Sequence, residues 1–570
     1  MILYNCSYIP VEFLMASKIP YKRVESQKSV VNGELHNNLC SFCLSTLPTK
    51  LSENDVLIWA DSCDSMRRSC DVLRRYFSGR VLPLEIPNVS TKLSVERFAH
   101  TLSNFFTSFK KAIKREITLS ELKKSHERLL FLIRSFNDAI RNNDLEKMAS
   151  LCKTITGNDY IGSIRRARNN ILIVGSPAPS SLIDVIEETG NSAINATCTG
   201  LVPCLGSPED LNEEDIFLSI AKRILEREFH CMRFVTERDI GSLRKYFDFN
   251  GIILHTAKFC DFYGFEEKKL KALNLPFVHI ETEPNHVSKE QIKTRLGALV
   301  ERISEPEQVR SQKKRFCAGI DSGSTSTKLV VVDSEKRILF KKVVKTGAFP
   351  KKTALDLLSN AVSKIGCDKQ EVYIIATGYG RGALNFADEA ITEITCHAKG
   401  VSHLFPNICT IIDIGGQDSK VIKLENGSVK DFIMNDKCAA GTGRFLEVMS
   451  QILEIPLSSM GDFSLRAQNS LSISSVCTVF AESEVISLRS QGHSREDIVA
   501  GLHTAISRRI TSMYERVNGK APVAFTGGVA LNKGLKVVLE KMLQTELLIP
   551  DDPEITGALG AALIGLEKSL

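Results

Sequence analysis

The feature that most constrains the fold is a pattern of strand, turn and strand that occurs twice in the second half of the chain. Residues 316–340 read FCAGIDSGSTSTKLVVVDSEKRILF, and residues 409–436 repeat the design as CTIIDIGGQDSKVIKLENGSVKDFIMND. In each copy an apolar strand reaches an aspartate, and a turn of small residues leads into a second strand. Two such units about a hundred residues apart predict two related subdomains that face a cleft. Turns of Gly, Ser and Thr let backbone amides approach phosphate oxygens, so we expect the cleft to bind a phosphate-bearing ligand.

Length and composition narrow the classes of function. A chain of 570 residues is too long for one core and predicts several domains. Its 73 basic and 67 acidic side chains give a net charge of only +6, which is a weak basis for binding nucleic acid. The opening MILYNCSYIPVEFLM lacks the basic start and cleavage site of a signal peptide, and no segment approaches the roughly twenty apolar residues that span a bilayer. We therefore expect a cytoplasmic protein without nucleic-acid or membrane partners, in which sixteen cysteines indicate metal or redox chemistry.

A polar stretch divides the chain into two halves of different character. Residues 303–315, at the start of ISEPEQVRSQKKRF, are the predicted linker between domains at 1–302 and 316–570. In the first half, apolar residues at helical spacing predict helices from about residue 95 to residue 157.

Beyond that helical stretch, the first half alternates apolar strands with helices. This alternation predicts a parallel sheet covered on both faces. Several cysteines follow strands, at the edge where α/β sheets place ligands. The predicted strands are NNILIVGS at 169–176, GIILHTAKFC at 251–260 and FVHIETE at 277–283.

Four segments of the second half together resemble a known superfamily. DSGSTSTK, DIGGQDSK, FTGGVALNKGL and PEITGALGAALIG are similar to the two phosphate segments, the adenosine segment and the closing helix of the acetate kinase, sugar kinase, Hsp70 and actin superfamily. The resemblance implies an actin-like (ribonuclease H-like) ATPase fold that binds ATP or ADP with Mg. It implies catalytic roles for Asp321, Asp413 and Gln417, the two aspartates holding Mg through its waters. The implied nucleotide-binding residues are Gly323, Ser324, Thr325, Ser326, Lys328, Gly415, Gly416, Gly527 and Gly528.

Two cysteine-bearing segments make the resemblance more specific. NDKCAAGTGRFLE and SVCTVFAESEVISL resemble the activator ATPases of the 2-hydroxyacyl-CoA dehydratases and benzoyl-CoA reductases. A 4Fe-4S cluster normally takes four thiolates, and this half supplies two in matching contexts, Cys438 and Cys477. A two-fold homodimer would supply the other two, giving one bridging cluster per dimer. Each cysteine precedes a predicted helix whose amino-terminal amides favour an anionic ligand, so a nucleotide-driven change in helix angle would couple ATP to electron release.

The first half resembles a second family. YNCSYIPVEFL, LCSFCLS, SCDSMRR, IVGSPAPSSLIDVIEETG, KFCDFYGFEEKKLKALNLPFVHIETE and KTRLGALVERI are similar to the cluster-bearing D component of the 2-hydroxyacyl-CoA dehydratases, including its double-cubane relatives. Cys152 lies in a helical apolar pattern and is read as structural, whereas Cys43 and Cys204 remain open as ligands. Five or six ligands would suit a double cubane, and three or four a single 4Fe-4S cluster. The ligands that the resemblance implies are Cys40, Cys63, Cys198, Cys231 and Cys260.

These expectations combine into one hypothesis with three rivals. One chain would join an iron–sulfur acceptor domain to its own ATP-driven electron donor, with a ferredoxin or flavodoxin as the external reductant. The acceptor would reduce a small-molecule or acyl-CoA substrate. In the first rival, the chain activates a separate dehydratase or reductase. In the second, it is a small-molecule kinase, although no carboxylate is evident as a base for the substrate. In the third, it is a non-catalytic nucleotide-dependent switch or scaffold, as actin-like proteins can be. Separately, His397 is expected to pack or orient a loop rather than bind metal.

Overall fold

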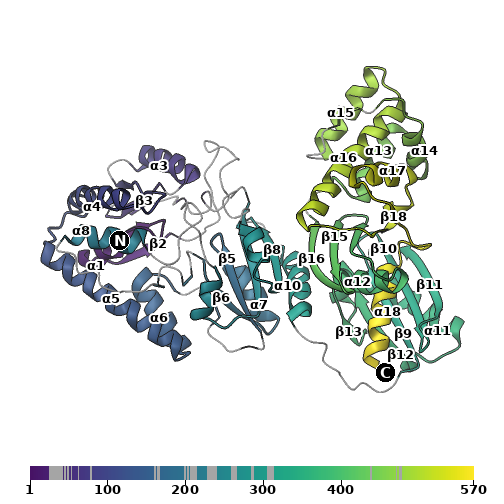
Figure 1. Ribbon diagram of the computed structural model, residues 1–570, viewed down its shortest axis with the longest axis horizontal. Helices are drawn as coiled ribbons and strands as arrows, with labels where there is room; N and C mark the ends of the chain where they lie inside the picture. Colours follow the sequence, from purple (N-terminus) through teal and green to yellow (C-terminus); the bar gives the residue numbers. More distant parts are fainter. Residues whose placement is uncertain are drawn as a thin grey trace. The chain divides into compact units, whose positions relative to one another are not determined.

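The chain forms two compact units, Met1–Leu299 and Val300–Leu570 (Figure 1). In the computed structural model, the described residues are 1–24, 43, 47, 51–52, 54–61, 63–77, 80–159, 162–163, 167, 169–197, 200–201, 204–205, 215–226, 240–258, 266–283, 288–303, 314–436, 439–469, 471–473 and 478–569.

The first unit begins with a four-stranded parallel sheet in the order β2-β1-β3-β4. All five side chains of β3 are buried. Ile58 and Ala60 pack in a core with helices α1, α4 (Lys92–Ile113) and α8, whereas Leu57 and Trp59 pack with α3. Helices therefore cover both faces, which explains why β3 is uniformly apolar. The elements are β1 (Ile2–Tyr4), β2 (Tyr21–Arg23), β3 (Val56–Ala60), β4 (Val81–Leu84), α1 (Val11–Ser17), α3 (Asp64–Tyr76) and α8 (Ile216–Leu225).

The predicted helical stretch is confirmed as three helices, α4 (Lys92–Ile113), α5 (Leu119–Arg141) and α6 (Leu145–Thr156). Capping boxes start α4 at Thr91 and α5 at Thr118. In each, the threonine hydroxyl accepts from the backbone amide of the third helical residue, Ser94 or Glu121, whose side chain accepts from the threonine amide.

A buried ion cluster joins three helices of the first unit. The carboxylate of Glu12 on α1 accepts hydrogen bonds from Arg223 Nε at 2.6 Å and Nη2 at 2.8 Å on α8, and lies 3.0 Å from His126 Nδ1 on α5. Burial alone would raise the pKa of Glu12, but Arg223 and His126 lower it to about 2. The cluster thus fixes α1 against α5 and α8 through a charge that would be costly to leave unpaired.

A second four-stranded parallel sheet, in the order β6-β5-β7-β8, confirms the α/β prediction for this half. One of its faces packs through Leu172, Val174, Ile252 and Leu254 on side chains of α5 and α6. The elements are β5 (Asn170–Gly175), β6 (Ser192–Asn195), β7 (Gly251–Ala257), β8 (Phe277–Thr282), α7 (Ser180–Glu188), α9 (Glu267–Lys271), α10 (Lys289–Ile303) and the 3-10 helix η2 (Ile240–Lys245).

The second unit contains two five-stranded sheets with the same topology, in the orders β11-β10-β9-β12-β13 and β16-β15-β14-β17-β18. In both, the first three strands along the chain are antiparallel neighbours and the last two are parallel additions. The predicted pair of related actin-like subdomains is therefore confirmed. The strands are β9 (Phe316–Ser322), β10 (Ser326–Asp333), β11 (Ile338–Lys345), β12 (Val372–Thr377), β13 (Glu389–Ala390), β14 (Thr410–Ile414), β15 (Ser419–Glu425), β16 (Ser428–Asn435), β17 (Val523–Thr526) and β18 (Leu547–Leu548).

Two helices of this unit, α12 (Glu393–Leu404) and α18 (Thr556–Ser569), pack with their backbones in close contact. A Cβ added to Gly400 would lie 2.1 Å from the carbonyl oxygen of Thr556, and one added to Gly560 would lie 1.7 Å from that of Cys396. Only glycine fits at either position. The other helices are α11 (Pro350–Ile365), α13 (Gly443–Leu453), α14 (Met460–Leu465), α15 (Thr478–Ser490), α16 (Arg495–Arg516) and α17 (Lys533–Leu543), with short 3-10 turns η4 (Lys369–Glu371), η5 (Tyr379–Ala383), η6 (Leu457–Ser459) and η7 (Gly528–Leu531).

Within the part of the chain that the structure describes, no helix is both long enough and apolar enough to cross a membrane.

Candidate active site

Each sheet of the second unit presents an aspartate paired with a lysine on the neighbouring strand. Asp321 on β9 lies directly opposite Lys328 on β10, and Asp413 on β14 lies opposite Lys420 on β15. The lysine ammonium is 3.0 Å from the carboxylate in the first pair and 3.4 Å in the second. The two halves of the repeat therefore place equivalent charges at equivalent positions of the two sheets.

Lys420 is surrounded by carboxylates in the interior. Its side chain is only 2% exposed, and its ammonium lies 2.8 Å from Asp418 and 3.3 Å from Glu393, in addition to Asp413. Burial alone would lower the pKa of Lys420, but the three carboxylates raise it well above its ordinary value. Burial is also the main reason that the pKa of Glu393 is raised.

Asp413 is held ionised by several neighbours. Burial alone would raise its pKa, but His397, Lys420 and a hydrogen bond from Thr526 lower it to about 2. The Thr526 hydroxyl donates to Asp413 Oδ1 at 2.8 Å, and His397 Nδ1 lies 3.7 Å from the same oxygen. A carboxylate that stays ionised while buried suits a site for a divalent cation and its waters.

A left-handed glycine follows the parallel strand beside each aspartate. Gly378 after β12 and Gly527 after β17 both have φ of 85°. A Cβ on Gly378 would lie 2.4 Å from Asp321 Oδ1, and one on Gly527 would lie 2.3 Å from the carbonyl oxygen of Ile414. Both the backbone conformation and the space exclude other side chains. The sequence reasoning selected Gly527 but missed Gly378, although the Thr-Gly dipeptide that ends both strands was a usable signal.

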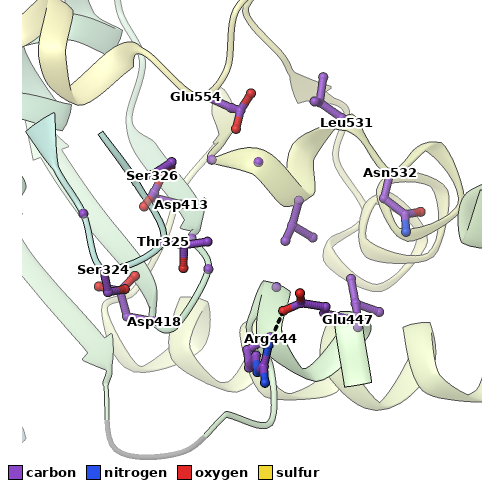
Figure 2. Close-up of a pocket in the computed structure, with 18 of the residues that line it drawn as sticks. Ser324, Thr325, Ser326, Asp413, Asp418, Arg444, Glu447, Leu531, Asn532 and Glu554 are labelled. Atoms are coloured by element: carbon purple, nitrogen blue, oxygen red, sulfur yellow. Dashed lines mark hydrogen bonds and ion pairs between the residues drawn. The ribbon is translucent and has the colours of Figure 1, made fainter. Parts of the chain in front are cut away.

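The two sheets enclose a cleft of about 870 Å³ (Figure 2). All the residues expected to bind the nucleotide line it, and so do Asp321 and Asp413. Gln417, the third expected catalytic residue, is exposed and does not line the cleft. Figure 2 shows Ser324, Thr325 and Ser326 on one side of the cavity and Leu531, Asn532 and Glu554 on the other. Titratable lining residues that the sequence reasoning did not assign to the cleft include Glu393, His397, Asp418, Lys420, Arg444, Glu447 and Glu554.

His397 was expected to pack or orient a loop, and it lines the cleft. Its Nδ1 lies 3.1 Å from the hydroxyl of Thr556, the first residue of α18, and 3.7 Å from Asp413 Oδ1. Glu393 and His397 lie one turn apart on α12, so both point to the same side of that helix. That spacing was the available signal for two cleft residues on one helix face.

The start of α13 is bonded to the second phosphate turn of the cleft. The amides of Gly443 and Arg444 donate to the carbonyl oxygens of Gly415 at 2.9 Å and Gly416 at 2.7 Å. The first turn of α13 is therefore bonded directly to the turn expected to hold phosphate.

The loop that precedes α13 is held in turn by α16. Asn435 Nδ2 donates to the carbonyl oxygen of Ala440 at 3.1 Å, and Arg509 Nη2 on α16 donates to Asn435 Oδ1 at 3.2 Å. The described residues on both sides of Cys438 are thus tied to regular structure.

The cysteines expected as cluster ligands lie mostly outside the described residues, and this applies to Cys438, Cys477, Cys40, Cys198, Cys231 and Cys260. Cys63 is described, and it immediately precedes α3 beyond the carboxyl end of β3.

The two cysteines left open as ligands are both buried. Cys43 has its Sγ 3.3 Å from both the carbonyl oxygen of Ser65 and Ser69 Oγ, and Cys204 lies in the same core as Cys152. Among the residues that the structure describes, no group of three His, Cys, Asp or Glu side chains is arranged to hold a metal ion.

Two family models match the chain, one in each half. Residues 6–303 match the family described as 2-hydroxyglutaryl-CoA dehydratase, D-component, and residues 318–565 match the BadF/BadG/BcrA/BcrD ATPase family. The chain belongs to both families. Its second half is an activator-type ATPase of the 2-hydroxyacyl-CoA dehydratase and benzoyl-CoA reductase group, which confirms the resemblance seen in the sequence.

Individual relatives match the ATPase at nearly full length. The chain is 44% identical over 256 residues to the 2-hydroxyisocaproyl-CoA dehydratase activator of Clostridioides difficile, covering 45% of this chain and 96% of that one. It is 43% identical to the (R)-2-hydroxyglutaryl-CoA dehydratase activating ATPase of Acidaminococcus fermentans, covering 45% and 98%. It is 33% identical to one of the subunits of benzoyl-CoA reductase from Thauera aromatica, covering 44% and 92%. Each relative therefore corresponds to less than half of this chain.

Proposed function

We propose that the chain uses ATP turnover in the cleft to drive low-potential electron transfer from a 4Fe-4S cluster shared by two copies of the chain to an iron–sulfur centre in its own first half. The proposed domains are the acceptor at 1–302, a linker at 303–315 and the ATPase at 316–570. The observation that carries the proposal is the pair of hydrogen bonds from Gly443 and Arg444 to the carbonyl oxygens of Gly415 and Gly416. These bonds give the nucleotide turn a direct mechanical connection to the helix that follows Cys438.

The surroundings of Cys438 and Cys477 fit a shared cluster. Cys477 directly precedes Thr478, the first residue of α15, and the loop after Cys438 leads into α13, which packs against α15. The two thiolates would therefore come from the starts of neighbouring helices, where helix dipoles favour negative charge. When bound, a cluster of this kind supplies a one-electron carrier of low potential.

The outer surface of α15 fits a second copy of the chain. Phe480 is 66% exposed and Ile486 is 53% exposed on this helix. Large apolar side chains exposed on the helix that follows Cys477 in the sequence are suited to burial in an isologous contact, which is the geometry that would bring two cysteine pairs to one axis.

The cleft residues fit binding of a nucleotide with Mg. Four carboxylates, from Asp321, Asp413, Asp418 and Glu393, surround the two ammonium groups of Lys328 and Lys420. Because acidic side chains predominate here, a divalent cation is needed before an anionic phosphate chain can approach. In the proposed complex Asp321 and Asp413 hold Mg through water, while Lys328 and the turns 323–326 and 415–416 bind phosphate.

The acceptor centre would be held by Cys40, Cys63, Cys198, Cys231 and Cys260. The place of Cys63 beyond the carboxyl end of a parallel strand and at the start of α3 fits a ligand position. A ferredoxin or flavodoxin would reduce the shared cluster, and the acceptor centre would reduce a small-molecule or acyl-CoA substrate.

The deciding experiment is anaerobic purification of the full chain with iron and sulfide counting and EPR spectra with and without Mg·ATP. We expect Cys438→Ser and Cys477→Ser each to remove one EPR signal while ATP binding is retained. Cys367→Ser, at a half-buried thiol beyond the end of α11, is the matched control and leaves the spectrum unchanged. An iron-free protein, or a full-strength signal in both ligand variants, would refute the proposal, and a phosphorylated product without iron would support a kinase.

A second candidate is that the chain activates a separate dehydratase or reductase, as the names of its relatives indicate for those proteins. Freeze-quenched EPR of the reduced chain after ATP addition separates the two. If the EPR signal of the shared cluster decays while a second signal appears in the same chain, the fused acceptor is supported. Electrons that leave only when a separate dehydratase is added support the activator.

A further inference from the structure

The first turn of α13 forms part of the cleft wall. Gly443, Arg444, Leu446 and Glu447 all line the cavity, and Figure 2 shows the Arg444 and Glu447 side chains paired at its edge. This turn therefore faces the nucleotide site on one side and continues into the loop of Cys438 on the other.

Arg444 pairs with a carboxylate of its own helix, unlike the two lysines of the cleft, which pair with aspartates of the sheets. Arg444 Nη1 lies 2.7 Å from Glu447 Oε2, three residues along the same helix, and the two side chains are 55% and 44% exposed. Exposed pairs of this spacing add little to stability, so the guanidinium exchanges partners readily. Lys328 is only 16% exposed and Lys420 is buried, and each pairs with an aspartate of the neighbouring strand, Asp321 or Asp413.

The backbone of Arg444 lies where the two phosphate turns meet. Its amide donates to the carbonyl oxygen of Gly416, and a Cβ on Gly416 would lie 2.4 Å from Thr325 Oγ1. Thr325 belongs to the first phosphate turn and Gly416 to the second, so a phosphate chain bound by both turns passes beside the start of α13.

We propose that Arg444 senses the nucleotide state by exchanging Glu447 for the terminal phosphate of a bound nucleoside triphosphate. A guanidinium binds phosphate in a bidentate, charge-assisted manner and gains more there than from an exposed carboxylate. When the terminal phosphate is lost, Arg444 returns to Glu447. Because Arg444 lies in the first turn of α13, each exchange pulls on the helix start that follows the Cys438 loop. The binding step stands on the cleft alone, whereas its consequence at Cys438 rests on the proposed function.

The binding step is tested by calorimetry on the full chain with Mg and either ADP or a non-hydrolysable ATP analogue. We expect Arg444→Gln to lower the affinity for the analogue by about tenfold or more and the affinity for ADP by less than about twofold, because only the contact with the terminal phosphate is lost. Glu447→Gln removes the carboxylate that competes for Arg444, so we expect it to raise the affinity for the analogue but not the affinity for ADP. Lys533→Gln, at another cation that lines the cleft but lies outside α13, is the matched control and affects both nucleotides alike. Equal weakening of both nucleotides in Arg444→Gln would overturn the proposal, and the retained ADP affinity reports that this variant is folded.

The effect on the helix is measured by hydrogen exchange of residues 439–453. In the wild type we expect the analogue and ADP to protect this segment differently, and in Arg444→Gln we expect the analogue to give the ADP pattern. An analogue-specific pattern that persists in the variant would refute the sensor role. Both measurements can be made on iron-free protein, so an absent cluster would refute the proposed function without deciding this inference.

Discussion

Replacing Lys420 with methionine tests whether the cleft is built around a buried cation. The substitution keeps a long side chain but removes the ammonium that lies within 3.4 Å of Asp413, Asp418 and Glu393. The carboxylates would then remain together in the interior without a counter-ion.

The expected loss of stability is large. Removing one partner of a buried ion cluster costs about 3–5 kcal/mol, since the remaining charges are left unpaired. For a unit of this size, 1 kcal/mol corresponds to roughly 2–4 °C in the melting temperature, which gives a decrease of roughly 6–20 °C.

The loss should also depend on pH. Without Lys420, mutual repulsion raises the folded-state pKa values of the carboxylates above their unfolded values. A folded state with raised carboxyl pKa values binds extra protons, so its stability falls as the pH rises through the interval between the unfolded and folded values. We therefore expect Lys420→Met to be less destabilised at pH 5.5 than at pH 8.

Differential scanning calorimetry of the full chain is the appropriate assay. The chain has two units, so the relevant transition is identified as the one that Mg·ADP moves to higher temperature in the wild type. Lys430→Met removes an exposed lysine of β16 that pairs with Glu425, and as the control it should change stability by less than about 1 kcal/mol. A Lys420→Met melting temperature that equals the wild-type value at pH 8 would show that the reasoning is wrong.

Two further predictions concern the first unit and the nucleotide turn. Glu12→Gln should lower the free energy of unfolding of the first unit by about 3 kcal/mol in urea titrations at pH 7, because the Arg223 charge loses its partner. The wild-type contribution is present above pH 4.5 and is lost as the pH falls towards 2, so the two proteins should converge in acid, and parallel curves would contradict this assignment. Gly527→Ala should abolish nucleotide binding in calorimetry because its Cβ would lie 2.3 Å from the carbonyl oxygen of Ile414. Gly492 is the control, since it has φ of 86° but no atom within 4 Å of an added Cβ. Gly492→Ala should lower the free energy of unfolding by only about 1 kcal/mol and bind nucleotide normally. Equal behaviour of the two glycine variants would show that close packing is not what requires Gly527.

The residues chosen from the sequence to bind nucleotide line the cleft, and there is a local reason why the sequence could place them there. The turns after Asp321 and Asp413 are short runs of small residues between apolar strands, and their geometry is decided within a few residues of chain. Such segments keep their signal when read in isolation, and the glycines, serines, threonine and single lysine chosen from them to bind nucleotide all line the cleft.

The residues that were missed depend on contacts between distant segments. Glu393 and His397 are ordinary helical residues until α12 packs on α18, which brings Thr556 to His397 across 159 positions of sequence. Arg444 and Glu447 likewise look like a surface pair until their helix start bonds to the turn at Gly416. Gln417 shows the opposite case, because it lies inside a recognisable motif yet is exposed and outside the cleft lining, and its expected catalytic role stays a prediction.

The sequence by itself determined the twice-repeated strand and turn pattern, the parallel α/β character of the first half and membership of both families, because these rest on short-range periodicity and on motifs that survive in order along the chain. The tertiary structure alone decided which charges meet. Whether Glu393 joins the carboxylates around Lys420, and whether His397 packs against a core or lines a cleft, depends on how α12 packs on the sheet and on α18, which lies about 159 positions away in the sequence. Burial strengthens these charge–charge contacts, because charges removed from water interact strongly enough to shift pKa values and are unfavourable without a partner.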